Sequence, residues 1–147
     1  MNPSSHQNHK RLSLESEIKV RFGEVDSMGI VWHGNYVKYL EDGREAFGKA
    51  YGISYMTVFK QHGYMIPLVK MDIDYKHQLF YEDEAILKTT LVDHPAAKIC
   101  FEYELYRKSD HALIMTAKTI QIFMNKDREL ELNTPEFFKQ WKEKYFQ

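Results

Sequence analysis

Residues 35–51 read NYVKYLEDGREAFGKAY, and this segment decides the fold. Its apolar and small side chains recur at about 100° per residue, which places them on one side of a helix: Tyr36, Tyr39, Leu40, Gly43, Ala46, Phe47 and Ala50. Its charged side chains fall on the other side: Lys38, Glu41, Asp42, Glu45 and Lys49. The pattern predicts an amphipathic helix over Asn35–Tyr51 that ends at Gly52. The small residues on its inner side would let a sheet approach closely.

The residues before this helix divide into three parts. Residues 1–16 are polar, with few apolar anchors, and predict a flexible N-terminal tail. Residues 17–22 alternate between apolar and charged side chains and predict a half-buried strand. Residues 23–34 hold three glycines and no sustained period, so they predict an ordered loop. A single domain is therefore expected over residues 17–147.

The residues after the helix predict a sheet. A short helical turn is expected over Ile53–His62, ending at Gly63. Four segments rich in β-branched and aromatic residues follow, separated by short polar turns: Met65–Tyr75, Glu84–Asp93, Lys98–Lys108 and Leu113–Asn125. Short turns imply antiparallel pairing. A last helix is expected over Pro135–Tyr145, with Thr134 as its N-cap.

This order of elements predicts an α+β fold in which an antiparallel sheet wraps around one long central helix. Such a sheet keeps an open edge, which a second subunit can cover, so a dimer is expected.

Composition excludes several classes of function. Twenty basic and 21 acidic residues leave a net charge of -1, which indicates neither a nucleic-acid groove nor binding to an anionic membrane. No stretch approaches the roughly 18 apolar residues of a membrane span, and the first residues lack the apolar run of a signal peptide. Cys100 is the only cysteine and has no partner for an internal disulfide, which favours a cytoplasmic location.

The loop over residues 23–34 carries the chemistry. It holds Asp26 and leads directly into the start of the long helix. Free backbone N–H groups at a helix start can stabilise a negative charge that develops on an oxygen, and a nearby carboxylate can act as nucleophile or general base. Together these parts suit hydrolysis of an activated acyl group. From the residues alone, an Asp at this position is more often a cap or turn residue than a catalytic one.

The run RFGEVDSMGIVWHGNY over residues 21–36, followed by Tyr39, Leu40, Glu41 and Arg44, resembles the 4-hydroxybenzoyl-CoA thioesterase family, which includes the Tol-Pal-associated acyl-CoA thioesterases. The resemblance covers roughly residues 17–132. It implies the hotdog fold, assembly as homodimers or homotetramers, and hydrolysis of an acyl-CoA thioester to free acid and CoA. CoA is then part of the substrate, and neither a separate cofactor nor a metal is implied.

The resemblance also implies roles for individual residues. Asp26 matches the catalytic aspartate, as nucleophile or general base, and the backbone N–H of His33 or Gly34 would polarise the carbonyl. The His33 side chain is either catalytic or substrate-orienting, or a hydrogen-bonded loop histidine. Glu24 could support catalysis or be structural. Glu41 is a second candidate carboxylate, because another branch of hotdog thioesterases uses one on the central helix.

Substrate contacts and alternative functions stay open. The phosphates of CoA need cationic contacts, and four residues are available: Lys98, Lys118, Lys126 and Arg128. The acyl group is expected in an apolar slot between subunits, lined by the helix and by the strand within Tyr64–Tyr75.

Two other functions fit the same fold: hydration or dehydration of an enoyl thioester, and non-catalytic binding of an acyl thioester or an acyl-carrier protein.

Overall fold

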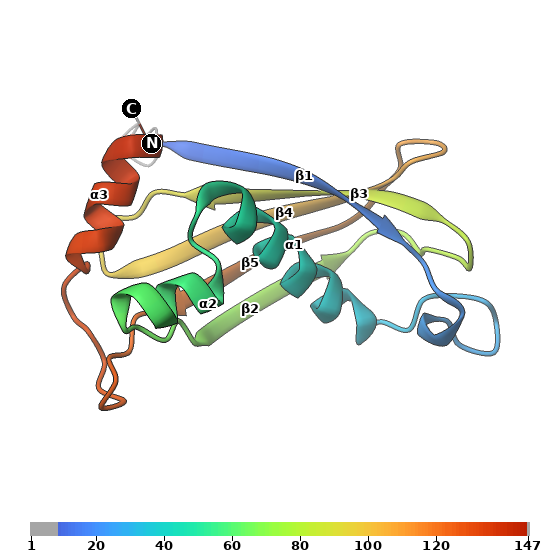
Figure 1. Cartoon of the computed structure of the whole chain (residues 1–147). Coiled ribbons are helices and arrows are strands. Elements are labelled where there is room, and N and C mark those ends of the chain that lie inside the picture. Colours follow the sequence, from blue (N-terminus) through green and yellow to red (C-terminus); the bar gives the residue numbers. More distant parts are fainter. Residues whose placement is uncertain (1–8, 147) are drawn as a thin grey trace, which may run out of the picture.

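The computed structural model describes residues 9–146 and contains one sheet, one long helix and several shorter helical segments (Figure 1). In chain order the elements are β1 (Arg11–Lys19), η2 (Phe22–Glu24), α1 (Asn35–Tyr51), α2 (Tyr55–Thr57), η3 (Val58–His62), β2 (Leu68–Tyr75), β3 (Glu84–Val92), β4 (Lys98–Arg107), β5 (Leu113–Ile122) and α3 (Glu136–Tyr145).

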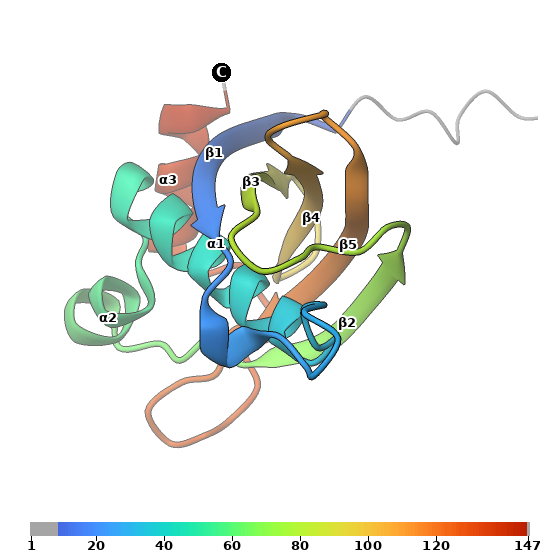
Figure 2. The same ribbon diagram turned by 90° about the vertical axis from the view of Figure 1, so that its right-hand side faces the viewer.

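The five strands form a single sheet in the order β1-β3-β4-β5-β2, and every neighbouring pair is antiparallel. The sheet curls around α1, which lies in its concave face (Figure 2). This arrangement confirms the predicted α+β architecture with a central helix.

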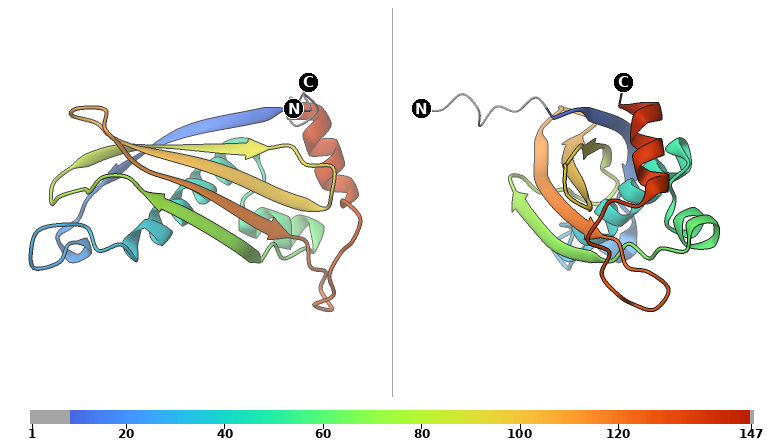
Figure 3. Two further views of the ribbon diagram at one scale, coloured as in Figure 1. Left: turned by 180° about the vertical axis from the view of Figure 1, so that it is seen from behind. Right: turned by 90° about the vertical axis from the view of Figure 1, so that its left-hand side faces the viewer.

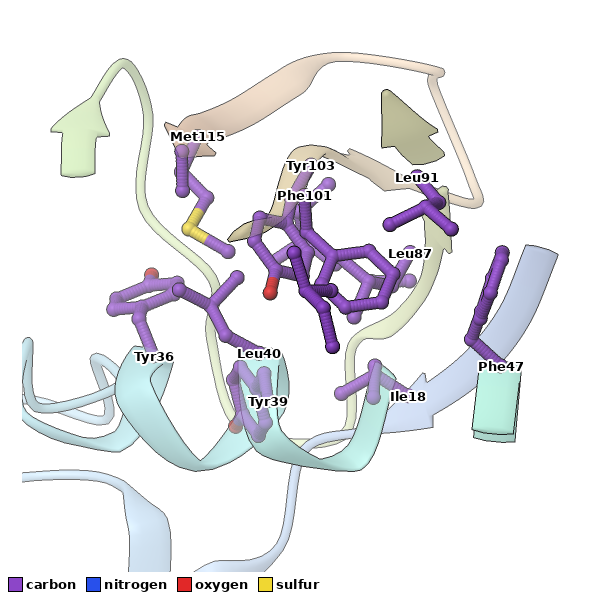
Figure 4. Packing of buried hydrophobic residues seen from close by; sticks show 14 of the residues in the cluster. Ile18, Tyr36, Tyr39, Leu40, Phe47, Leu87, Leu91, Phe101, Tyr103 and Met115 are labelled. Carbon is purple, nitrogen blue, oxygen red and sulfur yellow. The ribbon is translucent and has the colours of Figure 1, made fainter. Parts of the chain in front are cut away.

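Helix α1 begins and ends where the periodicity predicts. It buries Tyr36, Tyr39, Leu40 and Phe47 among side chains of the sheet (Figure 4). The left-handed conformation of Gly52, with φ of 75°, ends the helix. Of the side chains expected on the inner face, Ala50 is exposed.

The N-terminal boundary differs from the prediction. Strand β1 starts at Arg11, so residues 11–16, which were expected in a flexible tail, are part of the sheet. Leu12 and Leu14 lie opposite Leu91 and Thr89 of β3, and this pairing over a long sequence distance stabilises a segment that looks polar by itself. Residues 1–8 of the expected tail lie outside the described residues.

The other end of this strand was also predicted wrongly. β1 stops at Lys19, and Phe22 lies in the helical turn η2 with 76% of its surface exposed. Val20 is buried as expected.

The C-terminal helix α3 packs across the end of the sheet at which α1 ends (Figure 3). The indole N–H of Trp141 donates to the carbonyl of Tyr51, at 2.7 Å. Because Pro135 is the N-cap and no side chain caps this helix, the expected N-cap role of Thr134 is wrong.

Candidate active site

The loop between β1 and α1 folds into a small hairpin that is tied to the segment before β3. Val25 bridges Val31, and Ile30 bridges Phe80. The backbone N–H of Val31 donates to Leu79, at 2.9 Å. Gly29, with φ of 76°, makes the tight turn. The loop is therefore held from two sides, although it contains little regular secondary structure.

Asp26 lies in the turn of this hairpin and is exposed. Its Oδ1 accepts hydrogen bonds from the backbone N–H groups of Met28, at 2.8 Å, and Ile30, at 3.3 Å. Within residues 9–146 no group donates to Oδ2. The turn thus fixes the orientation of the carboxylate through one oxygen and leaves the other oxygen available to a substrate or water.

The start of α1 presents free backbone donors. Asn35 and Tyr36 donate their N–H groups to Trp32 and His33, whereas the N–H groups of His33 and Gly34 have no acceptor among the described residues. Orphan N–H groups at the positive end of a helix are suited to hold an oxyanion. A Cβ atom at Gly34 would lie 2.1 Å from a ring atom of Trp32, so a larger residue here would require the exposed Trp32 ring to move.

Glu24 joins the loop to the first turns of α1. Its carboxylate accepts from the hydroxyl of Tyr39 and from the N–H of Arg21, both at 2.9 Å. Its carbonyl accepts from the Nδ2 of the buried Asn35, at 2.8 Å, and from the N–H of Trp32. Burial, followed by the adjacent Glu24 carboxylate, raises the pKa of Tyr39, which stays protonated as the donor. Through these contacts Glu24 connects the loop to the start of α1.

An aromatic cluster surrounds this helix start. The imidazole of His33 is exposed, lies 5.0 Å from the Trp32 ring, and meets Tyr75 edge-on with 6.4 Å between ring centroids. Tyr75 also packs edge-on against Tyr36, and its hydroxyl donates to the carbonyl of His33, at 3.3 Å. The sequence did not single out Tyr75, because it lies on β2 and meets the loop only in the folded chain.

Glu41 is exposed on α1, two turns beyond the helix start. It borders a cavity of about 560 Å³ between α1, α2 and the beginning of β2. Glu41 also borders a second pocket together with Glu24, whereas Asp26 lines neither of the two pockets.

The four cations considered for CoA do not form one cluster. Lys98 and Lys118 lie on the outer face of the sheet, where Lys118 pairs in register with Glu102. Lys126 and Arg128 lie in the segment after β5, at the end of the molecule opposite to the Asp26 loop (Figure 1).

Two negative observations apply to residues 9–146. Their His, Cys, Asp and Glu side chains include no group of three or more that could hold a metal ion. No helix in this range is long and apolar enough to cross a membrane.

Comparison with known proteins places the chain in a family. Residues 20–142 match the family model of the thioesterase-like superfamily. The chain is 32% identical over 131 residues to YneP of Bacillus subtilis (strain 168), whose name marks it as a provisional acyl-CoA thioesterase; the match covers 89% of this chain and 94% of YneP. It is 26% identical over 125 residues to the 1,4-dihydroxy-2-naphthoyl-CoA hydrolase of Synechococcus elongatus, covering 83% and 89% of the two chains.

Solved structures show the same fold. The DHNA-CoA thioesterase of Staphylococcus aureus superposes with a TM-score of 0.80 at 28% identity, covering 90% of this chain and 88% of that one. The 4-hydroxybenzoyl-CoA thioesterase of Pseudomonas sp. strain CBS-3 superposes with a TM-score of 0.77 at 20% identity, covering 88% and 98%. The chain therefore belongs to the thioesterase-like superfamily, has the hotdog fold expected from the residues around Asp26, and is a thioester hydrolase.

Proposed function

We propose that this protein hydrolyses an acyl-CoA to the free acid and CoA at the loop over residues 23–34. The observation that carries the proposal is the pair of free backbone N–H groups at His33 and Gly34, at the start of a buried helix and in the same pinned loop as Asp26. The names of YneP and of the dihydroxynaphthoyl-CoA hydrolase support acyl-CoA as the substrate.

Asp26 would act through its free Oδ2, by one of two routes. As a general base it takes a proton from water, whose oxygen bonds to the thioester carbonyl carbon. As a nucleophile its oxygen bonds to that carbon and displaces the CoA thiolate, and water then hydrolyses the resulting anhydride. In both routes the carbonyl oxygen becomes negative, the C–S bond breaks, and the CoA sulfur ends as a thiol. The N–H groups of His33 and Gly34 would hold the oxyanion.

The side chains around this centre have lesser proposed roles. The His33 imidazole would orient the substrate from its exposed position beside Trp32. Glu24 would act only through the loop that it anchors. We give Glu41 no part in the chemistry, because it lies on the cavity wall two turns along α1.

The proposed assembly is a homodimer or homotetramer in the cytoplasm, without a separate cofactor. One long edge of β2 has no strand beside it in the described chain. A second subunit at this edge would cover it and would complete an acyl slot beside α1.

Substitution of Asp26 by Asn tests the proposal. Asn keeps an oxygen that can accept from Met28 and Ile30, so the turn is retained, while the basic carboxylate is lost. We expect kcat to fall by about a hundredfold to ten-thousandfold, with an unchanged thermal unfolding midpoint. Release of free thiol from a broad panel of acyl-CoA substrates measures turnover.

Near-normal turnover by well-folded Asp26→Asn enzyme would contradict the role of Asp26. Tight binding of acyl-CoA without any thiol release by the unmutated protein would favour a binding module, and loss of enoyl-thioester absorbance without thiol release would favour a hydratase.

A further inference from the structure

The cavity beside α1 has mostly apolar walls. Phe47 and Ile53 line it from the helical side, Ile66 from the segment before β2, and Ile99 and Phe101 from β4. Its volume of about 560 Å³ is within the range of pockets that hold small organic ligands. Its walls include the helix and the strand region expected to line the acyl slot.

Two cations border the cavity, and one of them, Lys49, is paired with Glu45. The other, Arg44 on α1, is half-buried, and its Nη1 donates to the hydroxyl of Tyr103, at 3.0 Å. The Tyr103 hydroxyl is in turn 2.6 Å from Oγ1 of Thr119. The Tyr103 hydroxyl thus contacts the guanidinium at one point and is itself held by Thr119. A guanidinium has five N–H donors, and no other acceptor for Arg44 lies among the described residues.

The charge of Arg44 also lacks an anionic partner. No carboxylate in residues 9–146 lies within ion-pair distance of it, although Glu41 and Glu45 border the same cavity and Glu45 pairs with Lys49 instead. Burial raises the pKa of Tyr103 despite the opposing effects of Arg44 and Thr119, so this phenol stays neutral and does not supply the missing charge.

A purely hydrocarbon ligand would fit this cavity poorly. It would remove water from the free N–H donors of Arg44 without replacing those hydrogen bonds, which is unfavourable for a charged group. A ligand with an oxygen acceptor at that point would satisfy them. Because guanidinium groups bind carboxylate and other planar oxygen groups in a fixed geometry, Arg44 can also select its ligand.

The position of Arg44 along α1 sets the length of such a ligand. Ten residues separate it from Gly34, which corresponds to about 15 Å along the helix axis. Helical side chains lean towards the N-terminus, so the guanidinium lies closer to the proposed oxyanion site than its Cα atom does. A chain of medium length running along α1 from that site would place its far end beside Arg44.

We propose that the cavity binds acyl groups that carry an oxygen acceptor several carbons beyond the thioester carbonyl, and that Arg44 is the residue that selects them. The inference rests on the proposed thioester hydrolysis at the Asp26 loop, and it names the substrate class of that site.

Matched pairs of substrates test the inference. Suberyl-CoA is compared with octanoyl-CoA, sebacyl-CoA with decanoyl-CoA, and terminally hydroxylated octanoyl-CoA is included as a neutral oxygen donor-acceptor. We expect kcat/KM to be about tenfold to a hundredfold higher for the oxygenated member of a pair, the usual effect of a hydrogen bond to a charged group. Comparison of the substrates that end in a carboxylate with the one that ends in a hydroxyl shows whether Arg44 recognises a negative charge or any oxygen acceptor.

Arg44→Met should bring the ratio of kcat/KM values within each substrate pair close to one. Met has a long unbranched side chain like Arg but has no N–H donors. Tyr103→Phe removes only the hydroxyl that anchors Arg44 and should lower the kcat/KM ratio in part. This second variant tests the role of Arg44 even if the Arg44→Met protein does not fold. Arg11→Met is the matched control, because Arg11 pairs with Glu102 on the outer face of the sheet. The ratio compares two substrates on the same enzyme, so a general loss of stability would not change it.

The two proposals fail differently. Equal kcat/KM values within every pair, unaffected by Arg44→Met, would overturn the role of Arg44 and leave thioester hydrolysis intact. Absence of thiol release from every substrate by folded, unmutated enzyme would contradict the proposed function itself.

Discussion

The carbonyl of His33 and the N–H of Gly34 belong to the same peptide group. Tyr75 donates its hydroxyl to that carbonyl, at 3.3 Å, while the N–H on the other side of the peptide is free. A hydrogen bond to a carbonyl polarises the whole peptide unit and makes its N–H a better donor. Tyr75 is therefore a positioning residue for the proposed oxyanion site, although it lies on a different element.

Substitution of Tyr75 by Phe isolates this effect. The ring would keep its packing against Tyr36 and His33, and only the hydroxyl would be lost. We expect kcat for acyl-CoA hydrolysis to fall by about threefold to tenfold, as for the loss of one modest hydrogen bond, with little change in KM. Steady-state kinetics measures both constants.

Tyr81→Phe serves as the control for Tyr75→Phe. Tyr81 is 46% exposed, packs edge-on against Phe22, and its hydroxyl has no partner among the described residues. Equal kinetic effects of the two substitutions would show that the hydrogen bond to His33 is not responsible.

The sequence reveals part of this site and conceals the rest. Asp26, His33 and Gly34 lie in one short motif, so a local resemblance is enough to propose them as candidates. The hydrogen bond between Tyr39 and Glu24 joins helix and loop, and no local pattern in the sequence indicates it. Tyr75 reaches the site through sheet geometry, and no local pattern marks it.

Among the elements, α1 depends on a close contact at its C-terminal end. A Cβ atom at Gly48 would lie 2.7 Å from the Cα atom of Ser54, which belongs to the backbone of the connection to α2. The N–H of Ile53 donates to the carbonyl of Gly48, at 2.9 Å, and holds that connection in place.

Gly48→Ala should therefore destabilise the protein. Alanine favours helix by about 1 kcal/mol over glycine, but the overpacking costs about 1–3 kcal/mol and the hydrogen bond to Ile53 must shift as well. We expect a net decrease in the free energy of unfolding, measured by chemical denaturation. Gly23→Ala is the control, because a Cβ atom there meets nothing within 4 Å. A stability of Gly48→Ala at or above that of the control would contradict this account.

Elements with strong local patterns were predicted well, and an element defined by distant pairing was not. The bounds of α1 follow from its period and from Gly52. The strands β3 and β4 were predicted to within one residue of their ends. β1 was misplaced because its inner face runs Leu12, Leu14, Ser16, and a strand with so few apolar residues exists only through its pairing with β3.

At the scale of the whole molecule, the two edges of the sheet differ. Strand β1 exposes Glu15, Glu17 and Lys19, charged residues of the kind that protect an edge from further pairing. Strand β2 also exposes charged residues, Lys70, Asp72 and Asp74, but in addition it exposes the large side chains of Val69 and Tyr75, which are 54% and 50% exposed. The proposed dimer contact therefore belongs at β2.

Sedimentation or light scattering should find a dimer or tetramer. Val69→Lys should shift the population towards the monomer and lower activity in parallel, because a charge would be placed in the contact. Leu132→Lys, at a 78% exposed apolar position in the segment before α3, is the control. A monomeric but fully active unmutated protein would contradict the proposed assembly.

The long-range pairing of β1 has a consequence for the order in which the chain becomes functional. Arg11 pairs with Val92 and Lys19 with Glu84, so the first strand has no partner until β3 has been synthesised. Contacts at such sequence separation are slow to form. The Asp26 loop directly follows β1 and is pinned to residues 79–81, so it reaches its final shape only after β1 has paired with β3 and residues 79–81 have folded against the loop. A nascent or partly unfolded chain would thus remain inactive, and turnover would report completion of folding.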